Sequence, residues 1–111
     1  MGNNKFEILW TEVAESDLSE IIEFIAQDST NMALKILAKI KVKTSQLNHS
    51  PERGRVVPEF KKFNINSIRE LIESPWRIFY KLEGSIVYIL CVIDSRRNVE
   101  DILLNRFLRG K

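Results

Sequence analysis

The first half of the chain has the apolar spacing of two amphipathic helices. After Thr11, a residue type that caps helix N-termini, apolar side chains recur every three or four positions and therefore share one helical face. This first stripe consists of Ala14, Leu18, Ile21, Ile22 and Ile25. A second stripe consists of Ala33, Ile36, Leu37, Ile40, Thr44 and Leu47. The turn-forming sequence "QDSTN" separates them, which predicts an antiparallel helical hairpin.

The flanking segments have the spacing of β-strands. Residues 6–10 and 76–82 alternate in side-chain character, which places successive side chains on opposite faces of a sheet. Residues 86–93 are apolar on both faces, as expected of a central strand. The short turn at Glu83 and Gly84 makes the last two strands antiparallel neighbours.

These patterns predict a single α+β domain over residues 1–111. Its order is an N-terminal strand, an antiparallel two-helix hairpin, three antiparallel strands beginning with "SIRELIE", and a short C-terminal helix in "NVEDILLNRFLRG". We expect a mostly antiparallel sheet with the hairpin across one face and the other face free of helices. A chain of this length can bury one core without disulfides or metals.

Composition predicts a cytoplasmic protein. The sequence contains no apolar run of about 18 residues, so no membrane span is expected, and its N-terminus lacks the pattern of a secretory signal. The one cysteine, Cys91, cannot form an internal disulfide, which fits a reducing compartment. Because Cys91 lies in an apolar strand, we expect it to be a small buried side chain. No metal or other cofactor is expected.

The formal net charge of +2 conceals an asymmetry along the chain. Residues 1–28 contain seven acidic side chains against one lysine, a balance of −6, and the remaining 83 residues have a balance of +8. A basic C-terminal portion favours a polyanion or an acidic protein as partner.

Four arginines are candidate contacts for such a partner. Arg69, Arg77 and the pair Arg96-Arg97 come from three successive strand segments. Since neighbouring strands lie about 4.8 Å apart, their side chains can converge on the sheet face that lacks helices. Clustered guanidinium groups bind phosphates through forked hydrogen bonds. The alternative is that Arg69 and Arg77 form structural salt bridges with Glu59, Glu70 or Glu73.

Three stretches carry a resemblance to a known family. They are "WTEVAESDLSEIIEFIAQDS", "PERGRVVPEF" and "IRELIESPWRIFYKLEGSIVYILCVIDSRRN", and their order and spacing resemble those of the RelE/ParE superfamily of toxins from type II toxin–antitoxin modules. The resemblance covers nearly the whole chain. It implies a small bacterial growth inhibitor that is neutralised by a cognate antitoxin protein. The outer surface of the helical hairpin and the sheet edges at residues 6–10 or 67–73 could receive that partner.

The superfamily contains two activities. RelE-like members cleave mRNA on the ribosome, and ParE-like members inhibit DNA gyrase. By resemblance, Arg77 and Arg97 would hold phosphate. The other groups of the nucleases do not match: their lysines would align near Ile68 and Glu70, their C-terminal tyrosine near Leu103, and their histidine is replaced by Asp94.

The ParE-like branch is therefore favoured, with this protein as a non-enzymatic inhibitor of DNA gyrase. Arg69, Arg77, Arg96 and Arg97 would then contact the target or nucleic acid. One alternative is a metal-independent ribonuclease that acts on ribosome-bound mRNA, for which Glu70 and Tyr80 are the remaining candidate proton carriers alongside Arg77 and Arg97. Another is an inactive relative that only binds an antitoxin.

Overall fold

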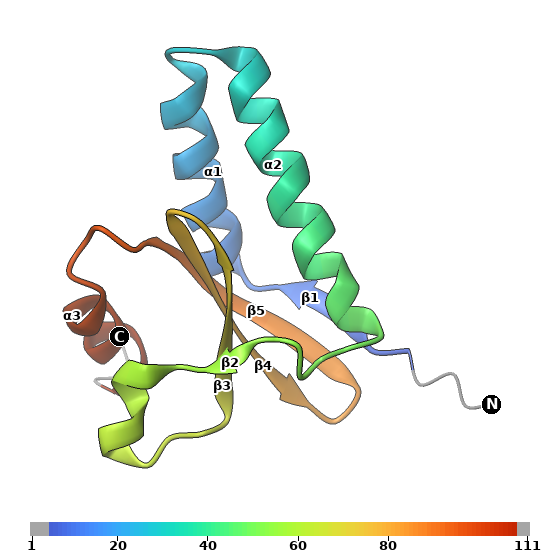
Figure 1. The fold of residues 1–111 in the computed structure, drawn as a ribbon, viewed down its shortest axis with the longest axis vertical. Coiled ribbons are helices and arrows are strands. Elements are labelled where there is room, and N and C mark those ends of the chain that lie inside the picture. The colour runs from blue at the N-terminus through green and yellow to red at the C-terminus, as the bar shows by residue number, and fades with distance from the viewer. Residues whose placement is uncertain (1–4, 109–111) are drawn as a thin grey trace.

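A five-stranded sheet forms the centre of the fold (Figure 1). The computed structural model describes residues 5–108. The strands run in the order β1-β5-β4-β3-β2 across the sheet. Their bounds are β1 (Glu7–Trp10), β2 (Arg55–Val56), β3 (Ile68–Glu73), β4 (Trp76–Glu83) and β5 (Ile86–Asp94). The predicted α+β class and the three consecutive antiparallel strands, β3 to β5, are confirmed.

The predicted helical hairpin covers one face of this sheet. It consists of α1 (Glu12–Ala26) and α2 (Thr30–Ser45), followed by the short helical turn η1 (Gln46–Asn48). Thr11 caps α1 by accepting a hydrogen bond from the Ala14 backbone N–H, and Ser29 caps α2 in the same way. The two apolar stripes pack on the sheet, where Ala14, Leu18 and Ile40 are buried with Ile78, Tyr80 and Ile89.

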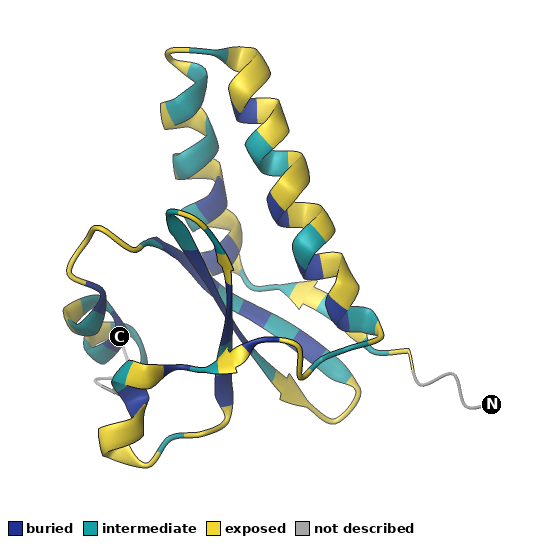
Figure 2. Cartoon of the chain, viewed as in Figure 1, coloured by how far each residue is buried: buried dark blue, intermediate teal, exposed yellow. Residues whose placement is uncertain are grey.

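The other face of the sheet is also covered, so the expected helix-free face is wrong. The covering elements are η2 (Pro58–Phe63), α3 (Val99–Leu103) and the π-helical turn η3 (Leu104–Leu108). Their apolar side chains close a second core with the sheet, made of Val57, Phe60, Ile68, Phe79, Cys91, Ile93, Val99 and Leu103. Figure 2 shows buried positions along the middle of the sheet and exposed positions along the outer sides of the helices.

The two outer strands differ in how well they were predicted. The expected N-terminal strand is confirmed as β1, which pairs with β5 in parallel up to Trp10, opposite Ile89. The two-residue strand β2 was not predicted, and it pairs with Arg69 and Glu70 of β3. It therefore covers part of the edge that was expected to be open at residues 67–73.

A buried tyrosine fixes the loop before β2. Tyr80 is fully buried, donates a hydrogen bond to the Pro51 carbonyl oxygen (2.8 Å) and accepts one from the Gly54 N–H (2.9 Å). The backbone of Gly54 passes so close to the sheet that a Cβ atom there would lie 2.4 Å from the Glu70 carbonyl oxygen. Only glycine fits at this crossing.

Candidate functional site

Arg77 is neutralised by two carboxylates on the face of the sheet that η2 covers. It is 8% exposed, and its guanidinium donates to Glu70 at 2.6 and 3.0 Å and to Glu59 at two distances of 2.8 Å. Arg55 donates to the same Glu70 carboxylate at 2.7 Å. These four side chains, here called the ion quartet, join the "PERGRVVPEF" and "IREL…WR" segments. Of the two readings given for Arg77 from the sequence, the one in which it forms structural salt bridges is therefore correct.

The ion quartet makes the stability of the fold depend on pH. The hydrogen bonds from Arg77 hold the pKa of Glu59 below its usual value, against the opposing effect of burial. A carboxyl group whose pKa is lower in the folded state than in the unfolded state stabilises the fold fully at pH values above the unfolded-state pKa. This stabilisation is lost as the pH falls through the folded-state pKa. We expect Glu59→Gln to lower the free energy of unfolding by about 1–2 kcal/mol at pH 7.

The same comparison at lower pH tests the cause. The difference between the wild type and Glu59→Gln should shrink as the pH falls below about 4.5, the range where a glutamate in an unfolded chain becomes protonated. Urea unfolding of both proteins between pH 7 and 3 measures this difference. A gap that stays constant across that range would show that the charge of Glu59 is not its source.

The four predicted arginines do not converge. Arg69 neighbours Glu70 in β3 and therefore points to the face opposite Arg77; it donates a hydrogen bond to the Gly54 carbonyl oxygen at 2.7 Å. Arg96 forms a forked pair with Asp94 in the turn after β5, at 2.9 and 2.6 Å, and the bond to Arg96 holds the pKa of Asp94 below its usual range. The expectation of a shared basic patch on one sheet face is thus wrong.

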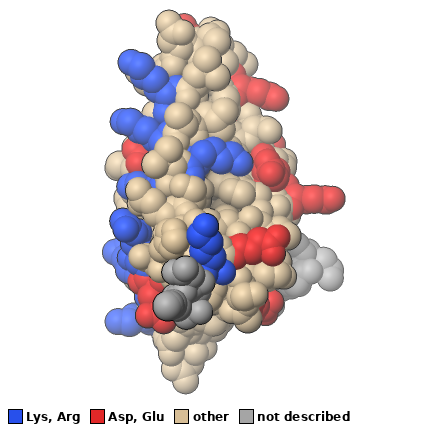
Figure 3. Space-filling model, turned by 90° about the vertical axis from the view of Figure 1, so that its right-hand side faces the viewer, with Lys and Arg blue, Asp and Glu red and all other residues tan. Residues whose placement is uncertain are grey.

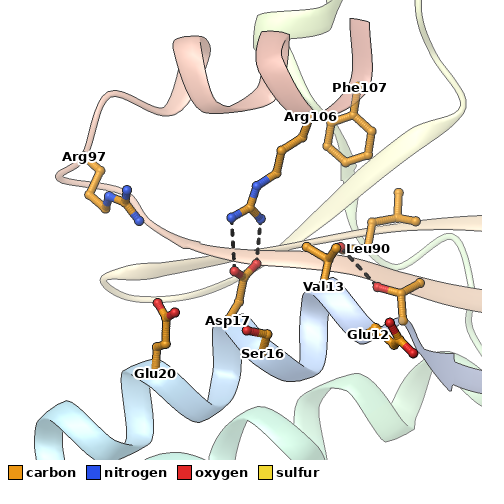
Figure 4. Close-up of a pocket in the computed structure, with 10 residues that line it drawn as sticks. Glu12, Val13, Ser16, Asp17, Glu20, Leu90, Arg97, Arg106 and Phe107 are labelled. Atoms are coloured by element: carbon orange, nitrogen blue, oxygen red, sulfur yellow. Dashed lines mark hydrogen bonds and ion pairs between the residues drawn. The ribbon is translucent and has the colours of Figure 1, made fainter. Parts of the chain in front are cut away.

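Arg97 lines a groove between α1 and the C-terminal segment (Figure 4). The groove has a volume of about 730 Å³, and Val13, Leu90 and Phe107 supply apolar lining. Arg97 is exposed, and within residues 5–108 its side chain makes no hydrogen bond or ion pair. Its guanidinium is therefore available to a partner.

An ion pair fixes the walls of this groove. Arg106 of η3 holds Asp17 of α1 through two hydrogen bonds of 2.8 and 3.1 Å, and these bonds raise the pKa of Arg106 (Figure 4). The Asp17 carboxylate also accepts the backbone N–H of Val92 at 3.0 Å. This N–H lies on the edge of β5 just past the end of β1, so the carboxylate takes the place of a strand partner.

A second hollow of about 450 Å³ continues the groove along α1. It shares Asp17 and Arg97 with the first and extends to Trp76 and Phe24. Phe24 is 73% exposed, the largest fraction among the exposed large apolar side chains of the described chain. Aromatic residues and arginine are enriched at protein–protein interfaces. The continuous surface formed by both hollows, here called the α1 groove, is suited to binding another protein.

The candidate proton carriers lie elsewhere and are occupied. Glu70 is 1% exposed and bonded within the ion quartet, and Tyr80 is bonded to backbone on both sides of its hydroxyl group. Burial raises the pKa of Tyr80 and raises that of Cys91, a buried thiol as predicted, to about 12. Over the described residues no group of three His, Cys, Asp or Glu side chains could hold a metal, and no helix there is long and apolar enough to cross a membrane.

Sequence patterns had missed the pair that shapes the α1 groove. Asp17 sits inside the apolar stripe of the first helix, one position before the buried Leu18, and Arg106 precedes the apolar Phe107 of the tail. An acidic residue within a core-facing stripe needs a partner, since an unpaired charge is costly to bury. This signal marks Asp17, but it does not identify Arg106.

Known proteins are similar to this chain over most of its length. The family described as "ParE toxin of type II toxin-antitoxin system, parDE" matches residues 8–99. The protein named Toxin RelE2 from Caulobacter vibrioides is 28% identical over 92 residues, covering 82% of this chain and 97% of that protein.

Solved structures share the fold. A chain from the chromosomal ParDE system of P. aeruginosa superposes with a TM-score of 0.67 at 21% identity, covering 83% of this chain and 98% of that one. A chain from the toxin–antitoxin complex RelBE2 of Mycobacterium tuberculosis gives a TM-score of 0.54 at 16% identity, with coverage of 81% and 91%.

Proposed function

This chain belongs to the ParE toxin family of type II toxin–antitoxin systems, and we propose that it arrests bacterial growth in the cytoplasm by binding DNA gyrase. The bound toxin would stop gyrase from completing strand passage without any covalent chemistry of its own. A cognate antitoxin would neutralise the toxin, a proposal supported by the two structural neighbours, one from a ParDE toxin–antitoxin system and one from the toxin–antitoxin complex RelBE2.

The state of Arg77 is the observation that carries the proposal. A ribonuclease needs a cation that is free to hold the phosphate and groups that are free to move protons. Arg77 instead has both edges of its guanidinium occupied by Glu59 and Glu70. Glu70 and Tyr80 are likewise committed to structural bonds. This arrangement favours a binding protein over a nuclease.

The α1 groove is the surface that we assign to gyrase. Arg97 lines both hollows of the groove and is free, and the second hollow also contains Arg96 and the exposed Phe24. Arg69 and Arg77 do not line the groove; Arg69 holds the loop before β2, and Arg77 belongs to the ion quartet.

Pulse-labelling after induction of this chain alone tests the proposal in bacteria. We expect DNA synthesis to fail within minutes while protein synthesis continues. In vitro, the purified toxin should inhibit supercoiling by gyrase, and Arg97→Ala should weaken inhibition about tenfold, as expected for loss of a central interface contact. Lys61→Ala, an exposed lysine outside the groove, serves as the control. Unchanged supercoiling at a large molar excess of wild-type toxin would contradict the proposal.

Cleavage of mRNA on the ribosome is the second candidate, because a relative at 28% identity carries the name Toxin RelE2. The same labelling experiment separates the two functions. Protein synthesis that collapses first, together with cleavage of ribosome-bound message, would favour the ribonuclease.

A further inference from the structure

The two helices of the hairpin carry opposite charges. α1 contains five acidic residues and no lysine or arginine, whereas α2 contains four lysines and no acidic residue. Figure 3 shows basic side chains gathered along one edge of the molecule and acidic ones toward the opposite edge. The α1 groove therefore has an acidic helix as one of its walls.

Two carboxylates on this wall are available to a partner. Glu12, Ser16 and Glu20 line the groove, and residues at i, i+4 and i+8 lie on one side of a helix and span about 12 Å along its axis. Both glutamates are exposed, and neither makes a hydrogen bond or ion pair with another residue in the part of the chain that the structure describes. Figure 4 shows Glu20 pointing across the groove toward Arg97, and no ion pair joins the two side chains.

The other charges of the groove mostly cancel within it. Asp17 is paired with Arg106, and Asp94 is paired with Arg96. Among the described residues that line the groove, Arg97 is the one cation without such a partner. Two free carboxylates against one free guanidinium give the unpaired charges of the groove an acidic balance.

We propose that the segment of gyrase that enters the α1 groove is basic. Two lysine or arginine side chains about 12 Å apart pair with Glu12 and Glu20, and an apolar side chain of the same segment packs on Val13, which is 49% exposed. A carboxylate of the segment meets Arg97. This assignment rests on the proposed function, because it takes gyrase as the occupant of the groove.

A polyanion is the poorer fit for this surface. Phosphates that approach Arg97 also approach the carboxylates of Glu12 and Glu20, and like charges repel each other. The acidic wall of α1 thus reverses the partner charge that Arg97 alone would favour.

Charge reversal on the acidic wall tests the sign of the partner. Glu12→Lys/Glu20→Lys should raise the toxin concentration that half-inhibits supercoiling by gyrase at least tenfold, because attraction becomes repulsion at two positions. Glu12→Gln/Glu20→Gln removes the charges without reversing them, so a smaller rise of about threefold is expected. The difference between the reversed variant and the wild type should narrow as potassium chloride is raised, since salt screens exposed charges.

A matched control lies on the same helix. Glu15→Lys/Glu23→Lys makes the same change in net charge at the same spacing, and Glu15, like Glu12, is an acidic residue of the first helical turn. Both control residues are exposed and border a different hollow, between α1 and α2. The control should inhibit gyrase within about twofold of the wild type. The two reversed variants should have equal urea unfolding midpoints, which separates loss of binding from loss of fold.

Each contrary outcome has one meaning. Equal inhibition by the reversed variant and its control would overturn the proposal. Stronger inhibition by Glu12→Lys/Glu20→Lys would also overturn it and would assign the groove to an acidic protein or to DNA phosphates. A wild-type toxin that leaves supercoiling unchanged would refute gyrase as the target only. Growth arrest then decides whether the occupant is basic, because the reversed variant should lose it and the control should keep it.

Discussion

Arg77→Met is expected to lower the free energy of unfolding by about 3–5 kcal/mol, the typical cost of removing one partner from a buried ion pair. The side chain of Glu70 is fully buried, and after the substitution Arg55, whose side chain is 58% exposed, would be the one remaining cation of the ion quartet beside it. Glu59 would lose its forked partner as well. Urea unfolding at pH 7 measures the loss.

The double variant Arg77→Met/Glu70→Gln separates charge from packing. This variant removes the buried carboxylate together with its cation. Its loss in free energy of unfolding should therefore be smaller than the sum of the losses in the two single variants. A loss below about 1 kcal/mol in Arg77→Met would mean that solvent replaces the guanidinium, as at exposed salt bridges. Additive losses would show that Arg77 and Glu70 do not interact energetically.

Gly54→Ala is expected to lower the free energy of unfolding by about 2–4 kcal/mol, from overpacking and from disturbance of the Tyr80 hydrogen bonds. The new Cβ would meet the Glu70 carbonyl oxygen at 2.4 Å and the Tyr80 hydroxyl at 2.7 Å. Because the first of these atoms belongs to the sheet backbone, the loop before β2 has to move away. Loss of the Tyr80 hydrogen bonds to this loop would be visible in the variant as faster hydrogen exchange at the backbone amide of residue 54.

Gly84→Ala is the matched control. Gly84 has φ of +62°, and nothing lies within 4 Å of a Cβ built there. This substitution adds backbone strain without a steric clash, so a loss of about 1 kcal/mol is expected. Equal losses at the two glycines would show that close packing is not what Gly54 is needed for.

Most of the fold could be predicted from periodicity. The helical hairpin and the strands β3 to β5 follow from runs long enough to show their period, and Thr11 marked the start of α1 through its capping chemistry. The strand β2 could not be predicted in this way, because two residues show no period. The cover on the second sheet face was missed for a related reason, since η2 is a short helical segment.

The candidate site was harder to predict, because its geometry depends on which face each side chain takes. Alternation places Arg69 and Arg77 on opposite faces once the pairing of β3 with β4 is known, but the sequence does not give this register. The sequence singled out four arginines as candidate binding residues. For Arg77, the alternative of structural salt bridges to Glu59 and Glu70 is the one that the structure shows. The Asp17–Arg106 pair joins positions 89 residues apart, so spacing does not reveal it.

The ion quartet also constrains how this protein can diverge. Its members come from β2, η2, β3 and β4, so four separate stretches of the gene encode one electrostatic unit. A single change at Glu59, Glu70 or Arg77 leaves a charge without its partner, whereas paired changes can restore neutrality. Descendants of this sequence should therefore change these positions together, while the exposed side chains of the α1 groove remain free to change with their binding partner.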